Sequence, residues 1–273
     1  MDVTLLGTGS PIPDPNRAGP SPLGRAGTAN VLVDAGRGVL MRLAGAGLFP
    51  VQVSAVLLTH LHSDHITDLN DVITTRWVMD TGSEPLRLYG PPGTAEVVDG
   101  LLAMLAPDIS YRLAHHDDLT GPPRVDVTEV APGDELRVDD VVVTVGRTDH
   151  RPVEPTVAYR FEHEGAVLVL GGDGVPCDTL DDLCRDAGTY VQTVVRDDLI
   201  RHVPFQRLVD ILDYHSSVAD AGRTAERAAV RCLVLTHGVP AIAPEAADEW
   251  RALAAEHFHG EIVVAADGDT LPV

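Results

Sequence analysis

The segment THLHSDH (59–65) constrains this chain more than any other feature of its sequence. It follows directly on the apolar run SAVLL (54–58), which is typical of a buried strand. Its four potential metal ligands are His60, His62, Asp64 and His65. Side-chain direction repeats every two residues in an extended chain, so His60 and His62 can hold one metal ion while the later pair serves a second. Neutral imidazole suits Zn²⁺ and a carboxylate compensates its charge, so the segment predicts a metal site rather than a histidine-rich surface loop.

Short β-branched runs alternate with helical patterns along the whole chain, and no linker or low-complexity segment divides it. The pattern predicts one mixed α/β domain, 1–273, with two similar halves of about 1–135 and 136–273. Each half supplies several strands and helices, which favours two facing sheets with helices outside. The segment 7–29, rich in Gly and Pro, is predicted to be a long irregular loop.

The composition favours a globular cytoplasmic protein. The N-terminal MDVTLLGTGS has no basic region or long apolar stretch, and no apolar run reaches the roughly 18 residues of a membrane span. The 3 cysteines form no CxxC pair and are expected to be reduced. Acidic residues outnumber basic ones by 41 to 20, which gives a formal charge of −21, and every basic residue is an arginine. This field repels phosphate backbones, and no arginine-rich run offsets it, so the charge argues against nucleic-acid binding.

The segment HLHSDH matches the HxHxDH motif of the metallo-β-lactamase superfamily. The N-terminal LLGTGSPIPDPNRAGPS and the later VDAGRG resemble the ribonuclease Z and arylsulfatase-like branch of that superfamily. The resemblance covers essentially the whole chain and implies an αββα sandwich of two facing mixed sheets. It also implies two divalent metal ions at one edge of the sheets, with zinc expected and manganese or iron as alternatives. A homodimer is implied as well, because dimers are common in this branch.

The same resemblance implies the remaining metal ligands by their motifs. His150 in TDHRPVEPTVAYRFE is similar to the histidine of the third family motif. Asp173 in LVLGGDG matches the SGDT motif, whose aspartate bridges both metals, and His237 in LVLTHG resembles the last ligand. The implied set is His60, His62 and His150 on the first metal and Asp64, His65 and His237 on the second, with Asp173 between them.

Two further residues resemble supporting parts of the family site. His215 in DYHSSVADAG resembles the histidine of the H-[ST]-T segment, which contacts the scissile group. Asp34 in VDAG resembles a carboxylate that orients a ligand histidine through its other ring nitrogen, with capping of the strand end as the alternative. The implied reaction is hydrolysis by a metal-bridging hydroxide that Asp64 orients. His215 would donate a hydrogen bond or proton to the oxyanion or leaving group.

Departures from the ribonuclease Z pattern favour a small-molecule substrate. The segment GTYVQTVVRDD lacks that enzyme's His-Glu pair, SGDT has become GGDG, and no long Gly/Pro-rich basic arm is visible. We therefore expect an ester-type bond in a small molecule, either a phosphodiester or sulfate ester or a lactone or carboxylic ester, with no nucleic-acid and no membrane partner. Arg151, Arg160 and Arg196 are candidates to offset the acidic field locally. The alternatives are a tRNA 3′-processing endonuclease, and an iron-dependent redox or non-catalytic accessory protein with the same fold.

Overall fold

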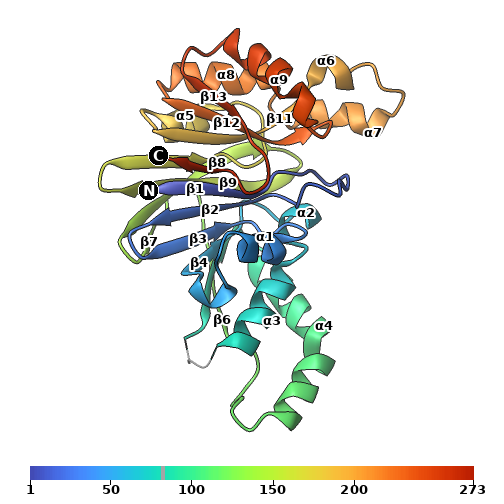
Figure 1. Cartoon of the computed structure of the whole chain (residues 1–273), viewed down its shortest axis with the longest axis vertical. Helices are drawn as coiled ribbons and strands as arrows, with labels where there is room; N and C mark the ends of the chain where they lie inside the picture. The colour runs from blue at the N-terminus through green and yellow to red at the C-terminus, as the bar shows by residue number, and fades with distance from the viewer. Residues whose placement is uncertain (81–83) are drawn as a thin grey trace.

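A computed structural model describes residues 1–80 and 84–273 of the chain and places them in four layers, with two sheets between two sets of helices (Figure 1). In spatial order the first sheet consists of β14 (Thr270–Pro272), β1 (Asp2–Gly7), β2 (Ser21–Ala26), β3 (Ala29–Val33), β4 (Ala55–Leu57), β5 (Leu86–Gly90) and β6 (Val125–Glu129). The second consists of β13 (Glu261–Val264), β12 (Cys232–Val239), β11 (Thr189–Val195), β10 (Ala166–Leu170), β9 (Val153–His163), β8 (Val141–His150) and β7 (Glu135–Val138). Both sheets are mixed, and the predicted αββα sandwich is confirmed.

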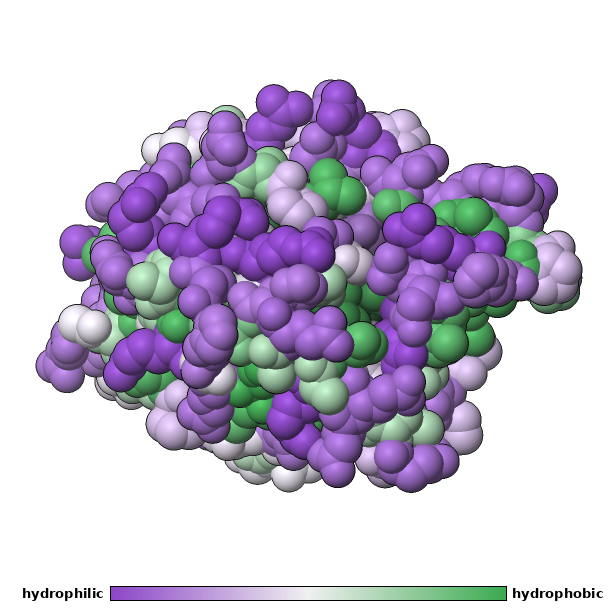
Figure 2. Space-filling view, turned by 90° about the horizontal axis from the view of Figure 1, so that it is seen from above, coloured by the Kyte–Doolittle hydropathy of each residue, from purple (hydrophilic) through white to green (hydrophobic). Residues whose placement is uncertain are grey.

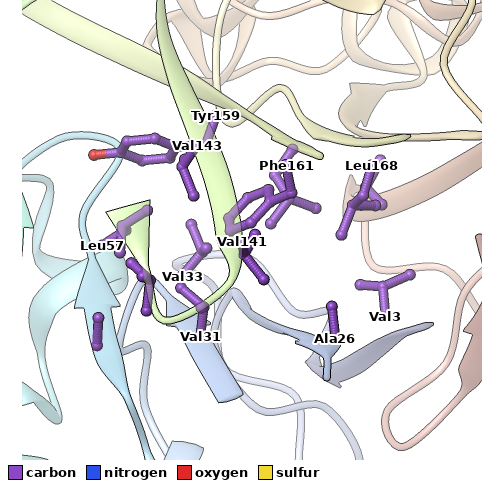
Figure 3. Close-up of a cluster of buried hydrophobic side chains, with 14 of the residues drawn as sticks. Val3, Ala26, Val31, Val33, Leu57, Val141, Val143, Tyr159, Phe161 and Leu168 are labelled. Carbon is purple, nitrogen blue, oxygen red and sulfur yellow. The ribbon is translucent and has the colours of Figure 1, made fainter. Parts of the chain in front are cut away.

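The strands are apolar on both sides, because each sheet is covered on both faces, and successive side chains alternate between the two faces. In β3, Val31 and Val33 point into the core between the sheets, whereas Leu32 packs under the helices of the first sheet. In β10, Leu168 and Leu170 face the same central core. Figure 3 shows side chains of this core, Leu168 among them, between the strands of the two sheets. The alternation thereby fixes which face of each strand lies toward the other sheet.

Helices cover the outer face of each sheet. The first sheet is covered by α1 (Val39–Gly45), α3 (Leu69–Met79) and α4 (Thr94–His115), and the second by α5 (Asp178–Cys184), α8 (Val218–Arg227) and α9 (Ala247–Ala255). The short helix α2 (Ser63–Ile66) follows β4. Within residues 1–80 and 84–273, no helix is long and apolar enough to cross a membrane.

The segment 7–29 contains a strand, so its prediction as an irregular loop is wrong in part. The strand β2, with the sequence SPLGRA, pairs with β1 on one side and β3 on the other. Its Pro and Gly disfavour a strand locally, but the two neighbouring strands supply the hydrogen bonds that hold it extended. Gly24 faces Leu168 of the opposite sheet, and a Cβ at this position would lie in ordinary van der Waals contact with it, at 3.6 Å.

A segment between β11 and α8 projects from the second sheet and carries the short helices α6 (Asp197–Ile200) and α7 (Gln206–Val209) (Figure 1). Seen from above, the same segment projects at the right, with apolar side chains among hydrophilic ones (Figure 2). Leu199 and Phe205 are among its exposed side chains. The base of the segment is anchored by Arg196, whose buried guanidinium donates to Asp198 and to Glu249 and lies over the ring of Trp250.

Candidate metal centre

Seven histidine and aspartate side chains meet at one edge of the two sheets, in segments that lie at or near strand ends. His60 and His62 follow β4 of the first sheet, and Asp64 and His65 lie in α2. The other three come from the second sheet: His150 ends β8, Asp173 follows β10, and His237 lies in β12. All seven residues that the sequence singles out as ligands are thus brought together.

Hydrogen bonds between the sheets hold the segment that leads into this cluster. Tyr159 of β9 donates its buried hydroxyl to the backbone oxygen of Leu58, at 2.7 Å. The backbone N–H of Val157 donates to the backbone oxygen of Thr59, at 2.9 Å. Because both bonds come from the opposite sheet, the histidines of the first sheet keep a fixed position relative to those of the second.

One part of the cluster consists of His60, His62, His150 and Asp173. His62 presents Nδ1, which lies 3.0 Å from Nε2 of His60 and 3.3 Å from Nε2 of His150. Oδ2 of Asp173 lies 3.8 Å from Nε2 of His60 and 4.0 Å from Nε2 of His150. These nitrogen and oxygen atoms converge on one point, as the ligands of a single cation do.

The other part consists of Asp64, His65 and His237. Nε2 of His237 lies 3.2 Å from Oδ2 of Asp64, and Nε2 of His65 lies 3.7 Å from the same oxygen. Oδ2 of Asp173 lies 3.4 Å from Nε2 of His65 and 3.9 Å from Nε2 of His237, so this oxygen stands between the two groups.

Asp34 orients histidines of both groups. Its Oδ2 accepts the Nδ1–H of His65 at 2.8 Å and the hydroxyl of Thr59 at 2.9 Å. The Thr59 hydroxyl in turn lies 3.0 Å from Nδ1 of His60, so Nδ1 of each histidine is held by a partner and Nε2 is left facing the cluster. The other oxygen of Asp34 accepts the backbone N–H of Thr59, at 2.8 Å, so this carboxylate also caps the neighbouring strand end.

Sequence reasoning missed Thr59 and the backbone oxygen of Tyr214. The Nδ1–H of His150 donates to that oxygen at 2.8 Å, which fixes the ring of His150. Thr59 stands directly before the HxHxDH motif, and this adjacency was the one available signal for its role. A backbone carbonyl has no residue-type signal, so the contribution of Tyr214 required the tertiary structure.

The GGDG sequence around Asp173 suits the backbone of this loop. Gly172 has a φ of +63°, a left-handed conformation that glycine adopts without a steric penalty. A Cβ on Gly171 would lie 2.2 Å from Oε1 of Gln192, which fills the space that a serine would occupy. Gln192 donates to the backbone oxygen of Gly172 at 3.0 Å, so it also supports the loop. At the position of the serine of SGDT, Gln192 therefore takes the space and supports the loop.

The environment favours uncharged imidazoles in the first group. Burial lowers the pKa of His62 and His150, and it lowers the pKa of His60 well below its ordinary value, with the charge of His65 adding to the effect. Burial opposes ionisation of Asp173, but His237 and His65 hold the pKa of this carboxyl well below its usual range. Neutral imidazole and ionised carboxylate are the forms that bind metal ions.

The cluster also has the chemistry that divalent cations require. Nε2 of His65 and Oδ1 of Asp173 are buried and have no hydrogen-bond partner among the described residues. Buried polar atoms without a partner are rare in proteins, and cations would supply partners here. With five imidazoles and two carboxylates in reach of one another, the residues fit a metal centre.

His215 lies beside the cluster, as its resemblance to the histidine of the H-[ST]-T segment implies. Its Nδ1–H donates to the backbone oxygen of Ile211 at 3.0 Å, and its Nε2 lies 3.3 Å from Oδ2 of Asp173. Burial opposes the charged imidazole, but the hydrogen bond to Asp173 raises the pKa of His215 above its ordinary value. A proton on Nε2 would thus face the centre of the site.

Two facing sheets covered by helices, with histidines and aspartates gathered at their edge, define the class of αββα metallohydrolases. Residues 29–238 match the family model described as the beta-lactamase superfamily domain. The chain belongs to the metallo-β-lactamase superfamily and is a hydrolase. It is 57% identical over 269 residues to a protein of Mycolicibacterium gilvum named Ribonuclease Z, covering 98% of this chain and 94% of that protein. A Ribonuclease Z of Mycobacterium bovis is 55% identical, covering 98% of this chain and 96% of that protein.

Solved structures share this fold over their full length. The metallo-beta-lactamase fold protein YhfI from Bacillus subtilis superposes with a TM-score of 0.78 at 25% identity, covering 99% of this chain and 98% of YhfI. The short form of human tRNase Z superposes with a TM-score of 0.72 at 22% identity, covering 100% of this chain and 99% of that structure. The second likeness concerns the fold alone.

The expectation of a small-molecule substrate and no nucleic-acid partner is wrong. The relatives with 55–57% identity over 98% of this chain are named Ribonuclease Z, a name that denotes action on RNA. The error came from giving weight to the departures from the ribonuclease Z pattern and to the net charge of −21, which is a sum over the whole surface. Salt screens exposed charges beyond about 8–10 Å, so this sum does not determine the potential at the site.

The three arginines considered as local counter-charges are already paired. Arg151 donates to Asp149, and Arg160 donates to Glu162. Arg196 donates to Asp198 and Glu249 at the base of the projecting segment. Each of the three arginines is thus engaged by a neighbouring carboxylate.

Proposed function

We propose that this chain is a metal-dependent ribonuclease Z that hydrolyses a phosphodiester bond at the 3′ end of precursor tRNA. The single observation that carries the proposal is the seven-residue cluster in a chain 57% identical, over 98% of its length, to a protein named Ribonuclease Z. The absent His-Glu pair does not remove any member of this cluster. Of the functions considered from the sequence, the tRNA-processing alternative therefore has the best support.

In this proposal the cluster holds two zinc ions. His60, His62 and His150 would hold the first ion and Asp64, His65 and His237 the second, with the carboxylate of Asp173 between the two groups. Five imidazoles favour zinc over magnesium or calcium, which prefer oxygen ligands. When bound, such a pair of cations activates water near neutral pH and stabilises the charge of a phosphoryl group. The ions would also add positive charge that offsets the local carboxylates.

The catalytic residues of the chain are then Asp64 and His215. Asp64 would help to hold metal, and its carboxylate would also orient the attacking water. His215 is fixed by its Nδ1–H bond to Ile211, so Nε2 can hold a proton where the leaving oxygen departs. The ring is thus held on one side by the backbone oxygen of Ile211 and on the other by Oδ2 of Asp173, 3.3 Å from Nε2.

A 3′-extended precursor tRNA tests the proposed function. With zinc at physiological salt, we expect the wild-type chain to remove the extension and the His62→Ala variant to lose cleavage, because His62 contacts both neighbouring histidines of its group. His259→Ala is the matched control, since His259 is exposed on the surface and pairs with Glu226. An intact extension after incubation with zinc-loaded protein would contradict the proposal, as would full cleavage by His62→Ala.

Replacing Asp34 by asparagine is expected to weaken zinc binding by about 10–100-fold, the usual effect of losing an orienting partner of a metal ligand. Asparagine tolerates the left-handed backbone that Asp34 adopts, with φ 59°, so the loop is expected to keep its shape. The asparagine lacks the charge that holds the Nδ1–H of His65. Competition with a chromogenic chelator measures the zinc affinity, and an unchanged affinity would refute the role of Asp34.

A further inference from the structure

A hollow of about 370 Å³ opens beside the metal centre, on the side of His62. Its lining residues are His62, Pro152, Val153, Arg207, Asp210 and Tyr214. His62 belongs to the cluster, so anything bound in the hollow would lie next to the reacting group. The volume is in the range of small-ligand sites.

Tyr214 presents an aromatic ring whose position is already fixed. The ring centroid lies 5.3 Å from that of His150, at an interplanar angle of 74°, and 4.8 Å from that of His215. Its hydroxyl makes no hydrogen bond with any residue that the structure describes. The backbone oxygen of Tyr214, not its side chain, holds His150, so a substitution of the ring leaves that bond available.

Arg207 presents a guanidinium without an internal partner. It is exposed on α7 and forms no ion pair or hydrogen bond within residues 1–80 and 84–273. Other arginines of the projecting segment are engaged: Arg201 donates to Asp197, and Arg196 to Asp198. The acidic residue in the same hollow, Asp210, accepts from Gln206. In a chain with charge −21, an unengaged guanidinium beside the centre suits an anionic ligand such as a phosphate.

We propose that this hollow binds one nucleotide flanking the scissile bond. The base stacks on Tyr214 beside the apolar surface of Pro152 and Val153, and the phosphate of that nucleotide pairs with Arg207. Stacking on an aromatic ring tolerates every base, because each base has a π face. The inference rests on the proposed function and names the part of the RNA that the site contacts.

Equilibrium binding of a fluorescent single-stranded RNA hexamer to the zinc-loaded protein tests the role of Tyr214. Tyr214→Ala is expected to weaken binding about tenfold, the effect of losing one stacked base, whereas Tyr214→Phe keeps the affinity. Abasic hexamers, each lacking one base, identify the stacked position. One abasic hexamer should bind the wild type about tenfold more weakly than the full hexamer does. The same abasic hexamer and the full hexamer should bind Tyr214→Ala with equal affinity. Equal effects of Tyr214→Ala on every hexamer would overturn the proposal.

The salt dependence of the same binding tests Arg207. Arg207→Ala is expected to reduce the slope of log affinity against log salt by about 0.7, the value for one phosphate contact on a single strand. Tyr111→Ala and Arg112→Ala are the matched controls, since both residues lie on α4, at the opposite end of the molecule from α7 (Figure 1). An unchanged slope in Arg207→Ala would remove this residue from the proposed subsite.

Cleavage of precursor tRNA separates this inference from the proposed function. We compare precursors that lack the base of one nucleotide on either side of the cleavage site. One of these abasic precursors should raise KM for the wild type but leave KM of Tyr214→Ala unchanged. If no precursor is cleaved but the hexamer still loses its base-dependent binding in Tyr214→Ala, the proposed function fails and the subsite stands. If precursors are cleaved and no coupling is seen, the subsite fails and the proposed function stands.

Discussion

Replacing Asp173 by asparagine is expected to lower hydrolysis by at least about a thousandfold and to reduce the zinc content per chain, because the charge stabilisation by such metals is worth several kcal/mol. Oδ2 of Asp173 lies within 4.0 Å of Nε2 of both His60 and His150 and 3.4 Å from Nε2 of His65. Asparagine has nearly the same shape but removes the negative charge between the two groups. The loss should therefore come from metal binding rather than from packing.

Elemental analysis and precursor cleavage, performed on the same preparation, measure the effect of Asp173→Asn. Asp178→Asn is the matched control, because Asp178 is an exposed residue of the first turn of α5 and loses the same charge. Circular dichroism verifies that both variants are folded. Wild-type zinc content together with wild-type cleavage in Asp173→Asn would exclude a bridging role for this carboxylate.

Replacing His215 by alanine is expected to lower kcat by about 100–10,000-fold, the usual contribution of one general acid, while the zinc content stays unchanged. A lower kcat with an unchanged zinc content distinguishes a proton donor from a metal ligand. Nε2 of His215 faces Asp173 at 3.3 Å, but the ring belongs to neither group of potential ligands. Single-turnover cleavage, which removes product release from the rate, measures the chemical step.

His202→Ala is the control for the His215 variant, since His202 is an exposed histidine of the same projecting segment. It should keep both the rate and the zinc content. If His215→Ala loses zinc in proportion to its rate, His215 is a metal ligand, and the assignment as proton donor is wrong. If His215→Ala keeps the full rate, another group must supply the proton.

The sandwich fold could be predicted because the motifs resemble those of a known family, and the local pattern of strands and helices agrees with that fold. The strand β10, with the sequence AVLVL, is apolar throughout, since a covered strand needs apolar side chains on both faces. The strand β2 could not be predicted, because its Pro22 and Gly24 disfavour a strand until β1 and β3 flank it. Propensity therefore failed where pairing with distant segments supplied the stabilisation.

The substrate was the weakest inference from the sequence, and the reason is spatial. Net charge can be counted along a chain, but the potential at a site depends on which charged groups lie near it and which are already paired. Arg196 and Arg160 are engaged in internal pairs, whereas Arg207 has no partner among the described residues and lines the hollow beside His62. Only the tertiary structure distinguishes an arginine that is paired internally from one that is not.

The sequence by itself determined the kind of chemistry, because the HxHxDH segment concentrates its ligands within a few residues of a strand end. Adjacent residues stay adjacent in any fold, so this part of the site did not depend on packing. The tertiary structure decided how His150, Asp173 and His237 join that segment from the second sheet. It also decided the chain of hydrogen bonds from Asp34 through Thr59 to His60. The ligands of the second sheet reach the segment only because burial of the central core presses the two sheets together, whereas Asp34 meets Thr59 because β3 and β4 pair side by side in the first sheet.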